Sequence, residues 1–177
     1  MTAVRHVVLL GLMAGGKTSV GRRVAARLNR PLLDGDDILE ERLGQTAAEI
    51  ADAEGIDRLH ELEAEIALEA LASTTPAVIG PAASVVELDA VRDAMAGHVV
   101  VWLAGSAAYH AERAVKKDHR PLLDDGDPLV LFEHQLATRG PLIRAVADLV
   151  IDVEATSKED QADAVVALVQ RDPGAAD

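Results

Sequence analysis

The sequence has no cysteine and very few aromatic side chains: one Trp, one Tyr and one Phe among 177 residues. Without cysteine the chain forms neither disulfides nor thiolate metal sites, and nothing in it indicates an oxidising compartment. Hydrophobic residues nevertheless make up 49% of the chain, so the core must consist mainly of Ala, Val, Leu and Ile. This composition favours closely packed helices against a Val-rich sheet.

Basic residues are also scarce, because 17 Lys and Arg stand against 30 Asp and Glu, for a formal net charge of −13. Binding to nucleic acid depends on clustered Lys and Arg that displace counterions, so nucleic acid is excluded as the main partner. The longest apolar run near the start, Val7 to Leu12, is far too short for a signal-peptide core or a membrane span. We therefore expect a cytoplasmic protein with no membrane partner, and we expect a monomer or a weak dimer.

A chain of this length has the size of a single domain, which buries about 70% of the surface of its unfolded chain. Short apolar segments typical of buried strands alternate along it with segments of helical periodicity. The predicted strands are 6–10, 31–34, 77–80, 98–103 and 149–153. The predicted helices are 17–28, 38–43, 46–55, 58–71, 87–95, one after Ser106, 129–137, 142–147 and one after Ser157. This alternation predicts one domain, residues 1–177, with a three-layer α/β/α fold and a five-stranded parallel sheet.

Residues 11–18, GLMAGGKT, match the phosphate-binding pattern G-x-x-x-x-G-K-[ST]. A buried strand precedes the pattern and an amphipathic helix follows it, which is the context that makes the match specific. Glycines let the backbone turn its N–H groups toward phosphate oxygens, and the helix N-terminus adds a favourable dipole. Lys17 then reaches the β- and γ-phosphates, and Thr18 can ligate Mg²⁺. The pattern predicts the fold of P-loop containing nucleoside triphosphate hydrolases, with ATP and Mg²⁺ as ligands. We expect the nucleotide to contact Gly11, Met13, Ala14, Gly15, Gly16, Lys17, Thr18 and Ser19.

Phosphoryl transfer also needs a carboxylate near the metal, a group that orients the attacking hydroxyl and a cation over the transferred phosphoryl group. Asp34 and Asp36 follow the second predicted strand, so both should lie at the carboxyl edge of the sheet, beside the P-loop. Either one could instead cap a helix that begins near Asp37. Arg120 lies in the polar, turn-rich segment 116–127, which we predict to be a mobile lid that closes on the nucleotide. A solvated loop arginine is the alternative.

Four segments of the chain resemble the shikimate kinases, P-loop kinases whose fold is similar to that of nucleoside monophosphate kinases. The P-loop and its helix, GLMAGGKTSVGRRVAARL, are similar to the opening of that family, and LLDGDDILEERLGQTAAEI resembles its D-x-D-x-x-I-E segment. HRPLL, residues 119–123, matches its lid motif, and TRGPLIRAVADLVID resembles its R-x-P-L-Y segment and last strand. The resemblance extends over nearly the whole chain and implies a transferase that moves the γ-phosphoryl group of ATP to a hydroxyl.

The resemblance also implies roles for individual residues. Lys17 and Arg120 would stabilise the transferring phosphoryl group, and Asp36 would orient or deprotonate the substrate hydroxyl. These three are the expected catalytic residues, while Thr18 and Asp34 would hold Mg²⁺. The residues implied to lie near adenine are Arg113 and the loop 152–156, with Val153 and Glu154.

The acceptor side departs from the family pattern in two places. The family's G-E-x-x-F-R-x-x-E appears here as GIDRLHELE, residues 55–63, so His60 replaces the arginine that would pair with the shikimate carboxylate. Arg58 lies about 200° away around the helix and does not substitute for it. A histidine lacks the two-pronged donor geometry of arginine and is mostly neutral near pH 7. The family's triple glycine is here Gly80-Pro81-Ala82, for which we expect a stiffer wall closer to any ligand.

The donor half of the expected site is therefore intact, whereas the acceptor half is rebuilt. We expect the helical segment 37–72 to form much of the acceptor side. The residues expected to bind the acceptor are Asp36, His60, Gly80, Pro81, Ala82 and Arg139. The leading hypothesis is an ATP-dependent kinase that acts on shikimate or a related polyol, cyclitol or sugar acid. The alternative is a nucleotide-binding paralogue that regulates a partner and has no acceptor chemistry. A third hypothesis is a nucleoside monophosphate kinase. It is disfavoured because the single short lid carries few arginines that could neutralise a second nucleotide.

Overall fold

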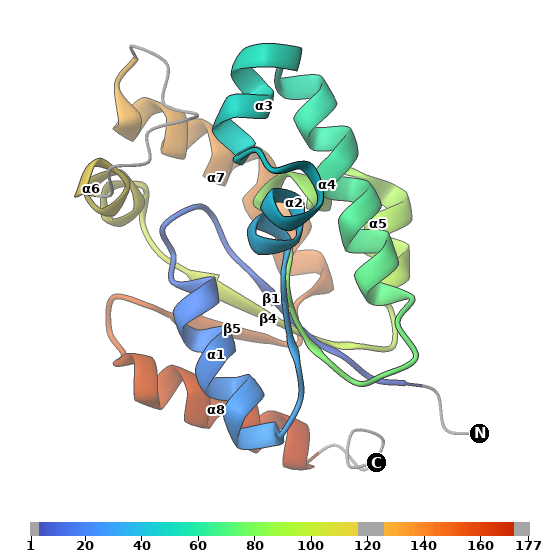
Figure 1. Cartoon of the computed structure of the whole chain (residues 1–177). Coiled ribbons are helices and arrows are strands. Elements are labelled where there is room, and N and C mark those ends of the chain that lie inside the picture. Colours follow the sequence, from blue (N-terminus) through green and yellow to red (C-terminus); the bar gives the residue numbers. More distant parts are fainter. Residues whose placement is uncertain (1–3, 117–125, 172–177) are drawn as a thin grey trace.

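The computed structural model describes residues 4–116 and 126–171, and within them the strands form one parallel sheet (Figure 1). The strands are β1 (Val7–Leu10), β2 (Leu32–Asp34), β3 (Val78–Gly80), β4 (Val99–Ala104) and β5 (Leu149–Asp152). Their spatial order is β2-β3-β1-β4-β5, and each neighbouring pair is parallel. The five predicted strands and the predicted α/β fold are confirmed, with strand ends shifted by one residue in places.

Strand β1 lies at the centre of the sheet. Val7 is in register with Val78 of β3 on one side and with Val99 of β4 on the other. Each β1 residue is at most 1% exposed, because helices cover both faces of the sheet. This double burial explains why the strand is apolar at every position instead of alternating. The P-loop that follows β1 therefore emerges from the middle of the sheet, at its carboxyl edge.

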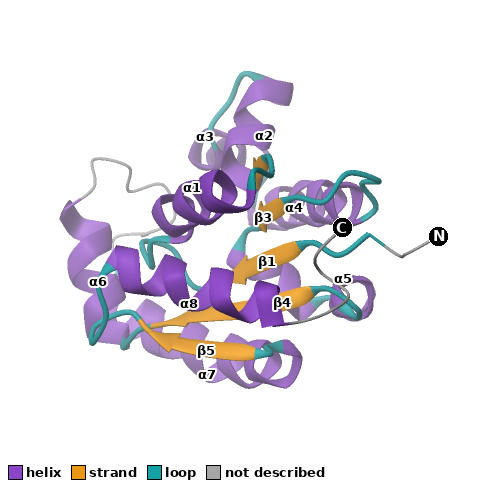
Figure 2. Ribbon diagram, turned by 90° about the horizontal axis from the view of Figure 1, so that it is seen from below, coloured by secondary structure: helices purple, strands orange, loops and turns teal. Residues whose placement is uncertain are grey.

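Two layers of helices enclose the sheet (Figure 1, Figure 2). Helices α1 (Lys17–Leu28) and α8 (Lys158–Arg171) pack on one face, where Val20, Val24 and Val165 join the strand side chains in one cluster. Helices α4 (Ile56–Leu71), α5 (Asp89–Met95) and α7 (Pro128–Val146) cover the other face. The core is built mainly from Ala, Val, Leu and Ile, as the composition predicts, with Trp102, Met95 and Phe132 as large exceptions.

A small helical unit follows β2 and stands at the carboxyl edge of the sheet. It consists of α2 (Gly35–Leu43), α3 (Ala47–Glu54) and the first half of α4, joined by a cluster of their own around Leu39, Ile50 and Leu59. Thr46 and Glu49 form a capping box at the start of α3. Helix α2 begins three residues before the predicted 38, because Asp34 caps it and the helix starts at once after β2. This unit corresponds to the predicted acceptor segment.

Two further predictions of helix boundaries are wrong. The predicted helices 129–137 and 142–147 are one helix, α7, which continues through Gly140 and Pro141. Gly140 is buried against Trp102, where an added Cβ would lie 3.8 Å from the ring, so packing against β4 keeps the helix intact. Pro141 leaves the carbonyl of Ala137 without an intrahelical donor, but Ala137 is exposed and water can satisfy it.

The predicted helix 87–95 is also divided differently. Its first residue, Glu87, ends a short 3₁₀ helix, η1 (Ala83–Glu87), and α5 starts only at Asp89. Helix α6 (Ala107–Lys116) follows Ser106, as predicted. Lys116 is the last residue of α6 and pairs with Glu112 at 2.5 Å. The predicted loop 116–127 therefore begins one residue too early.

Most of the predicted lid, including Arg120, lies outside the described residues. Asp127, at the end of the predicted lid, accepts a hydrogen bond from the backbone N–H of Leu129 and so caps α7. No helix within residues 4–116 and 126–171 has the length and hydropathy that crossing a membrane requires.

Candidate active site

The P-loop, residues 11–18, joins β1 to α1 and needs glycine at the two positions that the pattern specifies. Gly16 is the N-cap residue of α1 and has φ 93°, a left-handed conformation that L side chains rarely adopt. A Cβ on Gly11 would lie 2.8 Å from the carbonyl oxygen of Leu103 in β4. Ala14 also has a positive φ, 62°, so the loop carries strain at one non-glycine position. The tight turn predicted from the pattern is present.

Lys17 lies against the backbone of the same loop. Its Nζ donates to the carbonyl of Gly11 at 2.8 Å and to that of Leu12 at 3.4 Å. These contacts place the ammonium group inside the turn whose N–H groups are expected to bind phosphate. A compact charge at this point is what contact with the β- and γ-phosphates requires.

Helix α6 contacts the P-loop through two side chains, His110 and Arg113. His110 is buried against the ring of Phe132, and its Nδ1 lies 2.9 Å from the carbonyl oxygen of Met13. Because a carbonyl only accepts, Nδ1 carries the proton in this contact. Burial holds the pKa of His110 below its ordinary value, so the ring is neutral near pH 7. Arg113, one turn later, donates from Nε to the carbonyl of Ala14 at 3.0 Å and lies over the ring of Tyr109.

Arg113 was predicted to lie near adenine, and in the structure its side chain contacts the backbone of the P-loop. The support of the loop by His110 was not predicted. The sequence carries no local signal for that role, because His110 and Met13 are 97 positions apart.

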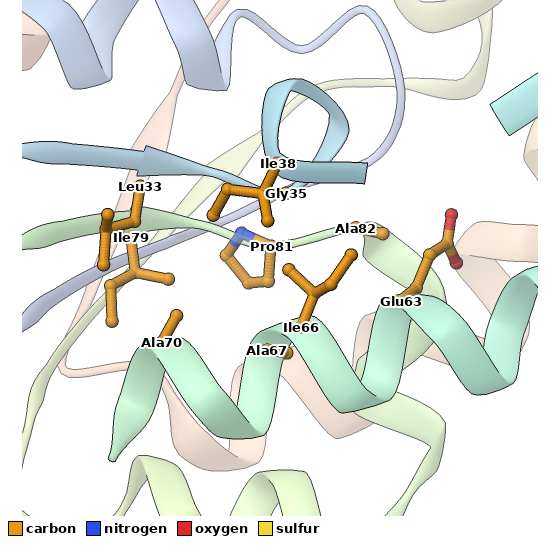
Figure 3. Close-up of a pocket in the computed structure, with 10 residues that line it drawn as sticks. All are labelled: Leu33, Gly35, Ile38, Glu63, Ile66, Ala67, Ala70, Ile79, Pro81 and Ala82. Atoms are coloured by element: carbon orange, nitrogen blue, oxygen red, sulfur yellow. The ribbon is translucent and has the colours of Figure 1, made fainter. Parts of the chain in front are cut away.

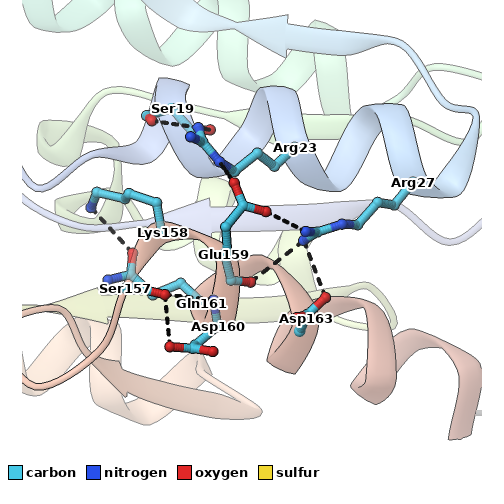
Figure 4. A network of polar contacts seen from close by, with 9 residues as sticks. All are labelled: Ser19, Arg23, Arg27, Ser157, Lys158, Glu159, Asp160, Gln161 and Asp163. Carbon is cyan, nitrogen blue, oxygen red and sulfur yellow. Dashed lines mark hydrogen bonds and ion pairs between the residues drawn. The ribbon is translucent and has the colours of Figure 1, made fainter.

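The start of α8 approaches the P-loop from another direction (Figure 4). Lys158 Nζ lies 3.4 Å from the carbonyl oxygen of Gly15 and 3.2 Å from Gln161 Oε1. Arg23 and Arg27 of α1 pair with Glu159 at 2.6 and 2.5 Å, which fixes the first turn of α8 beside α1. Each such exposed pair contributes at most about 1 kcal/mol, so their effect is orientation more than stability. Lys158 was not among the site residues predicted from the sequence.

The loop 152–156, predicted to lie near adenine, is well held between β5 and α8. Val153 is 5% exposed and belongs to the core, so only its backbone is available to a ligand. Glu154 accepts a hydrogen bond from the backbone N–H of Ser106 at 2.7 Å. Buried Gln161 donates to the carbonyl of Thr156 at 2.9 Å. These contacts bring the loop to the α6 side of the P-loop.

The two carboxylates after β2 have different surroundings. Thr18 donates its hydroxyl hydrogen to Asp34 Oδ2 at 2.6 Å, and Asp34 is only 6% exposed. Asp34 also caps α2 by accepting from the backbone N–H of Asp36 at 3.2 Å, so the predicted metal-site position and the capping alternative coincide in one residue. Asp36 itself is exposed in the first turn of α2.

The Thr18 hydroxyl and the Asp34 carboxylate fit a magnesium ion. Mg²⁺ prefers oxygen ligands and is bound in phosphoryl-transfer sites by one or two protein groups, with phosphate oxygens and water completing the shell. Among residues 4–116 and 126–171 no cluster of three or more His, Asp or Glu side chains could hold a metal ion by itself. A metal at this position would therefore depend on the nucleotide for the rest of its ligands.

On the acceptor side, Arg139 of α7 is paired within the chain. Its Nε donates to Glu87 Oε1 at 2.5 Å, and the Arg139 side chain is only 12% exposed, whereas that of Glu87 is 47% exposed. His60 of α4 lies within electrostatic reach of both. Burial, reinforced by the positive charge of Arg139, holds the pKa of His60 below its ordinary value, so this ring is neutral near pH 7.

Arg58 does not replace the missing arginine. It is exposed and pairs with Glu61 at 3.0 Å and with Glu54 at 3.8 Å, both on the outer side of the helical unit. The predicted direction of Arg58, away from His60, is confirmed.

Glu63, one turn after His60 on α4, is a site residue that was not predicted from the sequence. The hydroxyl of Ser84 donates to its carboxylate. Burial raises the pKa of Glu63 to about 7, the hydrogen bond from Ser84 opposes this, and the charge of Asp36 adds to it. Arg139 and Lys17 also act on Glu63, so it lies between the donor and acceptor sides. The only indication of this role in the sequence is that Glu63 is the last residue of segment 55–63, which resembles the family pattern G-E-x-x-F-R-x-x-E.

Pro81 and Ala82 form part of the wall of a mostly apolar hollow under α2 (Figure 3). Pro81 is buried, and its ring lies between the β2–α2 junction and Ile66 of α4. A Cβ on Gly35 would lie 3.4 Å from the backbone nitrogen of Ala82, so the two chain segments are in close contact. Glu63 lies at one end of the group of lining residues, and its carboxylate points away from the apolar side chains (Figure 3). The hollow is lined by Leu33, Gly35, Ile38, Glu63, Ile66, Ala67, Ala70, Ile79, Pro81 and Ala82.

The described site residues thus fall into two neighbouring groups at the carboxyl edge of the sheet. The P-loop, Lys17, Thr18 and Asp34 form the donor group. The acceptor group, which meets the donor group at Glu63, consists of Asp36, His60, Glu63, Ser84, Glu87 and Arg139. A phosphate cradle beside an acidic pocket is suited to phosphoryl transfer onto a hydroxyl.

Comparisons with known proteins agree with this geometry. A protein-family model described as shikimate kinase matches residues 13–170. The shikimate kinase of Rhodococcus erythropolis is 33% identical over 150 residues, which cover 85% of this chain and 88% of that protein. The shikimate kinase of Mycobacterium tuberculosis is 37% identical over 145 residues, 82% of each chain. The solved structure of shikimate kinase from Acinetobacter baumannii in complex with shikimate is similar at a TM-score of 0.88 and 26% identity, over 96% of this chain and 95% of that one.

Proposed function

The chain belongs to the shikimate kinase family, and we propose that it phosphorylates a small polyhydroxylated molecule, with shikimate as the first compound to test. It is an ATP-dependent phosphotransferase with an alcohol acceptor. The names of the relatives support this reading and not the alternative of a nucleotide-binding regulator without acceptor chemistry. The shikimate in the A. baumannii complex supports a small cyclic polyol as the kind of acceptor to expect.

The contact between Thr18 and Asp34 is the observation that supports the donor half of the proposal most directly. It brings two oxygen ligands together beside the P-loop, 2.6 Å apart. We propose that these two residues hold Mg²⁺, which when bound would neutralise charge on the β- and γ-phosphates. Lys17 and the N–H groups of the loop would contact the same phosphates.

Asp36 is the proposed group that orients or deprotonates the acceptor hydroxyl. It is exposed at the start of α2, two residues after the proposed metal ligand Asp34, and its charge acts on Glu63 across the pocket. Such a position allows a hydroxyl to be held between the γ-phosphate and the pocket. Arg120, outside the described residues, is the proposed cation over the transferred phosphoryl group.

The test is ADP formation by purified protein with Mg-ATP and a panel of shikimate, quinate, cyclitols and sugar acids, with the product identified by ³¹P NMR. Asp36→Asn should leave nucleotide affinity nearly unchanged and lower turnover by at least about 100-fold. The matched control is Asp37→Asn, a neighbouring exposed carboxylate in the same first turn of α2, which should retain turnover. If none of these compounds leads to ADP formation although the protein still binds ATP, the proposal is contradicted.

A further inference from the structure

A second lysine lies against the P-loop, at a different point from Lys17. Lys158 is the first residue of α8, and its side chain points away from the pairs that Glu159 forms with α1 (Figure 4). Its Nζ lies 3.4 Å from the carbonyl oxygen of Gly15. A Cβ on Gly16 would overlap with the same nitrogen. The ammonium group therefore lies where the loop enters α1.

A buried glutamine holds Lys158 in this position. Gln161, three residues later on α8, is 1% exposed, and its Nε2 donates to the carbonyl of Thr156 at 2.9 Å. Because a carbonyl only accepts, the amide nitrogen of Gln161 faces Thr156 and the amide oxygen faces Lys158. Lys158 Nζ donates to that oxygen at 3.2 Å. Lys158 is thus joined both to the P-loop and, through Gln161, to the loop 152–156.

The position of Lys158 is unfavourable for a positive charge in the protein alone. A helix N-terminus carries a partial positive charge, which favours anions and disfavours cations. Lys158 lies in the first turn of α8, where Glu159 and Asp160 have the favourable sign. Its Nζ also lies at Gly16, the N-cap residue of α1. Helix stability does not explain a lysine near two helix N-termini, whereas a bound anion would make this arrangement favourable.

The two lysines contact opposite ends of the P-loop. Lys17 Nζ lies at carbonyls at the start of the loop, and the lysine of this sequence pattern reaches the β- and γ-phosphates. Lys158 Nζ lies at the end of the loop and is joined to 152–156, the segment proposed to lie near the base. In a nucleotide the α-phosphate lies between the ribose and the β-phosphate. A nucleotide bound in this direction brings its α-phosphate closest to Lys158.

We infer that Lys158 is a nucleotide-binding residue that contacts the α-phosphate. This inference rests on the proposed binding of ATP by the P-loop and adds a second ammonium group to that site. The α-phosphate is not altered when the γ-phosphoryl group leaves, so Lys158 stabilises bound ATP and bound ADP alike. Such uniform binding increases affinity for the nucleotide and leaves the rate of transfer unchanged.

The experiment compares wild-type protein with Lys158→Met, which has a side chain of similar length without the charge. Calorimetry measures the affinities for Mg-ADP and for magnesium tripolyphosphate, which has neither base nor ribose. We expect Lys158→Met to bind both probes at least tenfold more weakly. Its free energy of unfolding without nucleotide should stay unchanged or increase, because a positive charge near two helix N-termini has been removed. Urea unfolding measures this second effect.

Three further variants make the result specific. Lys158→Arg keeps the charge and should retain at least a third of the affinity for each probe. Lys158→Gln should show the same loss as Lys158→Met and takes its place if that variant does not fold. Arg171→Met removes one positive charge from the exposed last residue of α8, far along the same helix. This matched control should change neither affinity.

The outcomes separate this inference from the proposed function. Wild-type affinity for ADP in Lys158→Met overturns the inference. A loss confined to ADP also overturns it, because Lys158 would then contact the base or the ribose. A loss that comes with a lower free energy of unfolding overturns it as well, because the role of Lys158 would then be structural. If wild-type protein binds neither probe, the proposed nucleotide site is wrong and the inference fails with it. If the affinities are as expected but no acceptor is phosphorylated, only the kinase proposal fails.

Discussion

The hydroxyl of Thr18 donates to the Asp34 carboxylate at 2.6 Å and so joins the first turn of α1 to the end of β2. Asp34 at the same time caps α2 through the N–H of Asp36. One buried carboxylate thereby connects the phosphate loop to the helical unit on the acceptor side. Substitutions at this residue can separate its structural and chemical roles.

Asp34→Asn should keep the cap, because an amide oxygen also accepts from the N–H of Asp36, so the free energy of unfolding should change by less than about 1 kcal/mol. The lost charge should raise the Mg²⁺ concentration needed for half-maximal ADP formation by about 10-fold or more. Asp34→Ala should lose the cap as well and unfold at a lower temperature. Thermal unfolding and Mg²⁺ titration of activity measure the two effects. An unaltered Mg²⁺ dependence in Asp34→Asn would rule out a metal-binding role.

His110→Phe should weaken ATP binding about three- to tenfold. Phenylalanine preserves the contact with Phe132 but cannot donate to the carbonyl of Met13, and one such hydrogen bond contributes about 0.5–1.5 kcal/mol. Calorimetric titration with a non-hydrolysable ATP analogue gives the affinity. His134→Phe, at an exposed position of α7, serves as the control. Wild-type affinity in His110→Phe would show that ATP binding does not depend on the contact between His110 and Met13.

Glu63→Gln should stabilise the protein at pH 8 by on the order of 1 kcal/mol. The folded state raises the pKa of Glu63 to about 7, so the charged form is disfavoured in it, and this cost disappears as the pH falls from about 7 toward the unfolded value of 4.5. The difference between variant and wild type should therefore vanish near pH 5. Urea unfolding at several pH values measures it, and a constant difference from pH 5 to 8 would contradict the assignment.

The His6 and His98 rings should make the protein less stable in acid. The centroids of the two rings lie 4.7 Å apart, at the amino ends of β1 and β4. Burial holds the pKa of each ring below its ordinary value of 6.5. A histidine with a lowered pKa binds its proton better in the unfolded state, so its stability contribution is complete above pH 6.5 and is lost as the pH falls below that value. His98→Asn should reduce the slope of unfolding free energy against pH between 6.5 and 5. His134→Asn, the exposed control, should leave the slope as in wild type.

Local patterns in the sequence determined much of the fold. The apolar runs predict all five strands, and the glycine spacing of residues 11–18 predicts the P-loop, because both depend on neighbours within a few residues. The position of Asp34 close to the P-loop could also be predicted from the sequence, because the carboxyl ends of parallel strands lie at the same edge of the sheet. The break expected at Gly140-Pro141 was wrong because burial of α7 against Trp102 outweighs the local preference of glycine and proline.

Only the tertiary structure decided which distant side chains meet at the site. The pairing of Glu87 with Arg139 joins residues 52 positions apart, and the support of Met13 by His110 joins residues 97 apart. The burial that raises the pKa of Glu63 likewise depends on elements packed around α4. Short-range periodicity carries no information on such contacts, because they arise from how the helices pack on the sheet. The sequence by itself thus determined a phosphate-binding kinase fold, whereas the charge of the acceptor pocket became apparent only when the chain was folded.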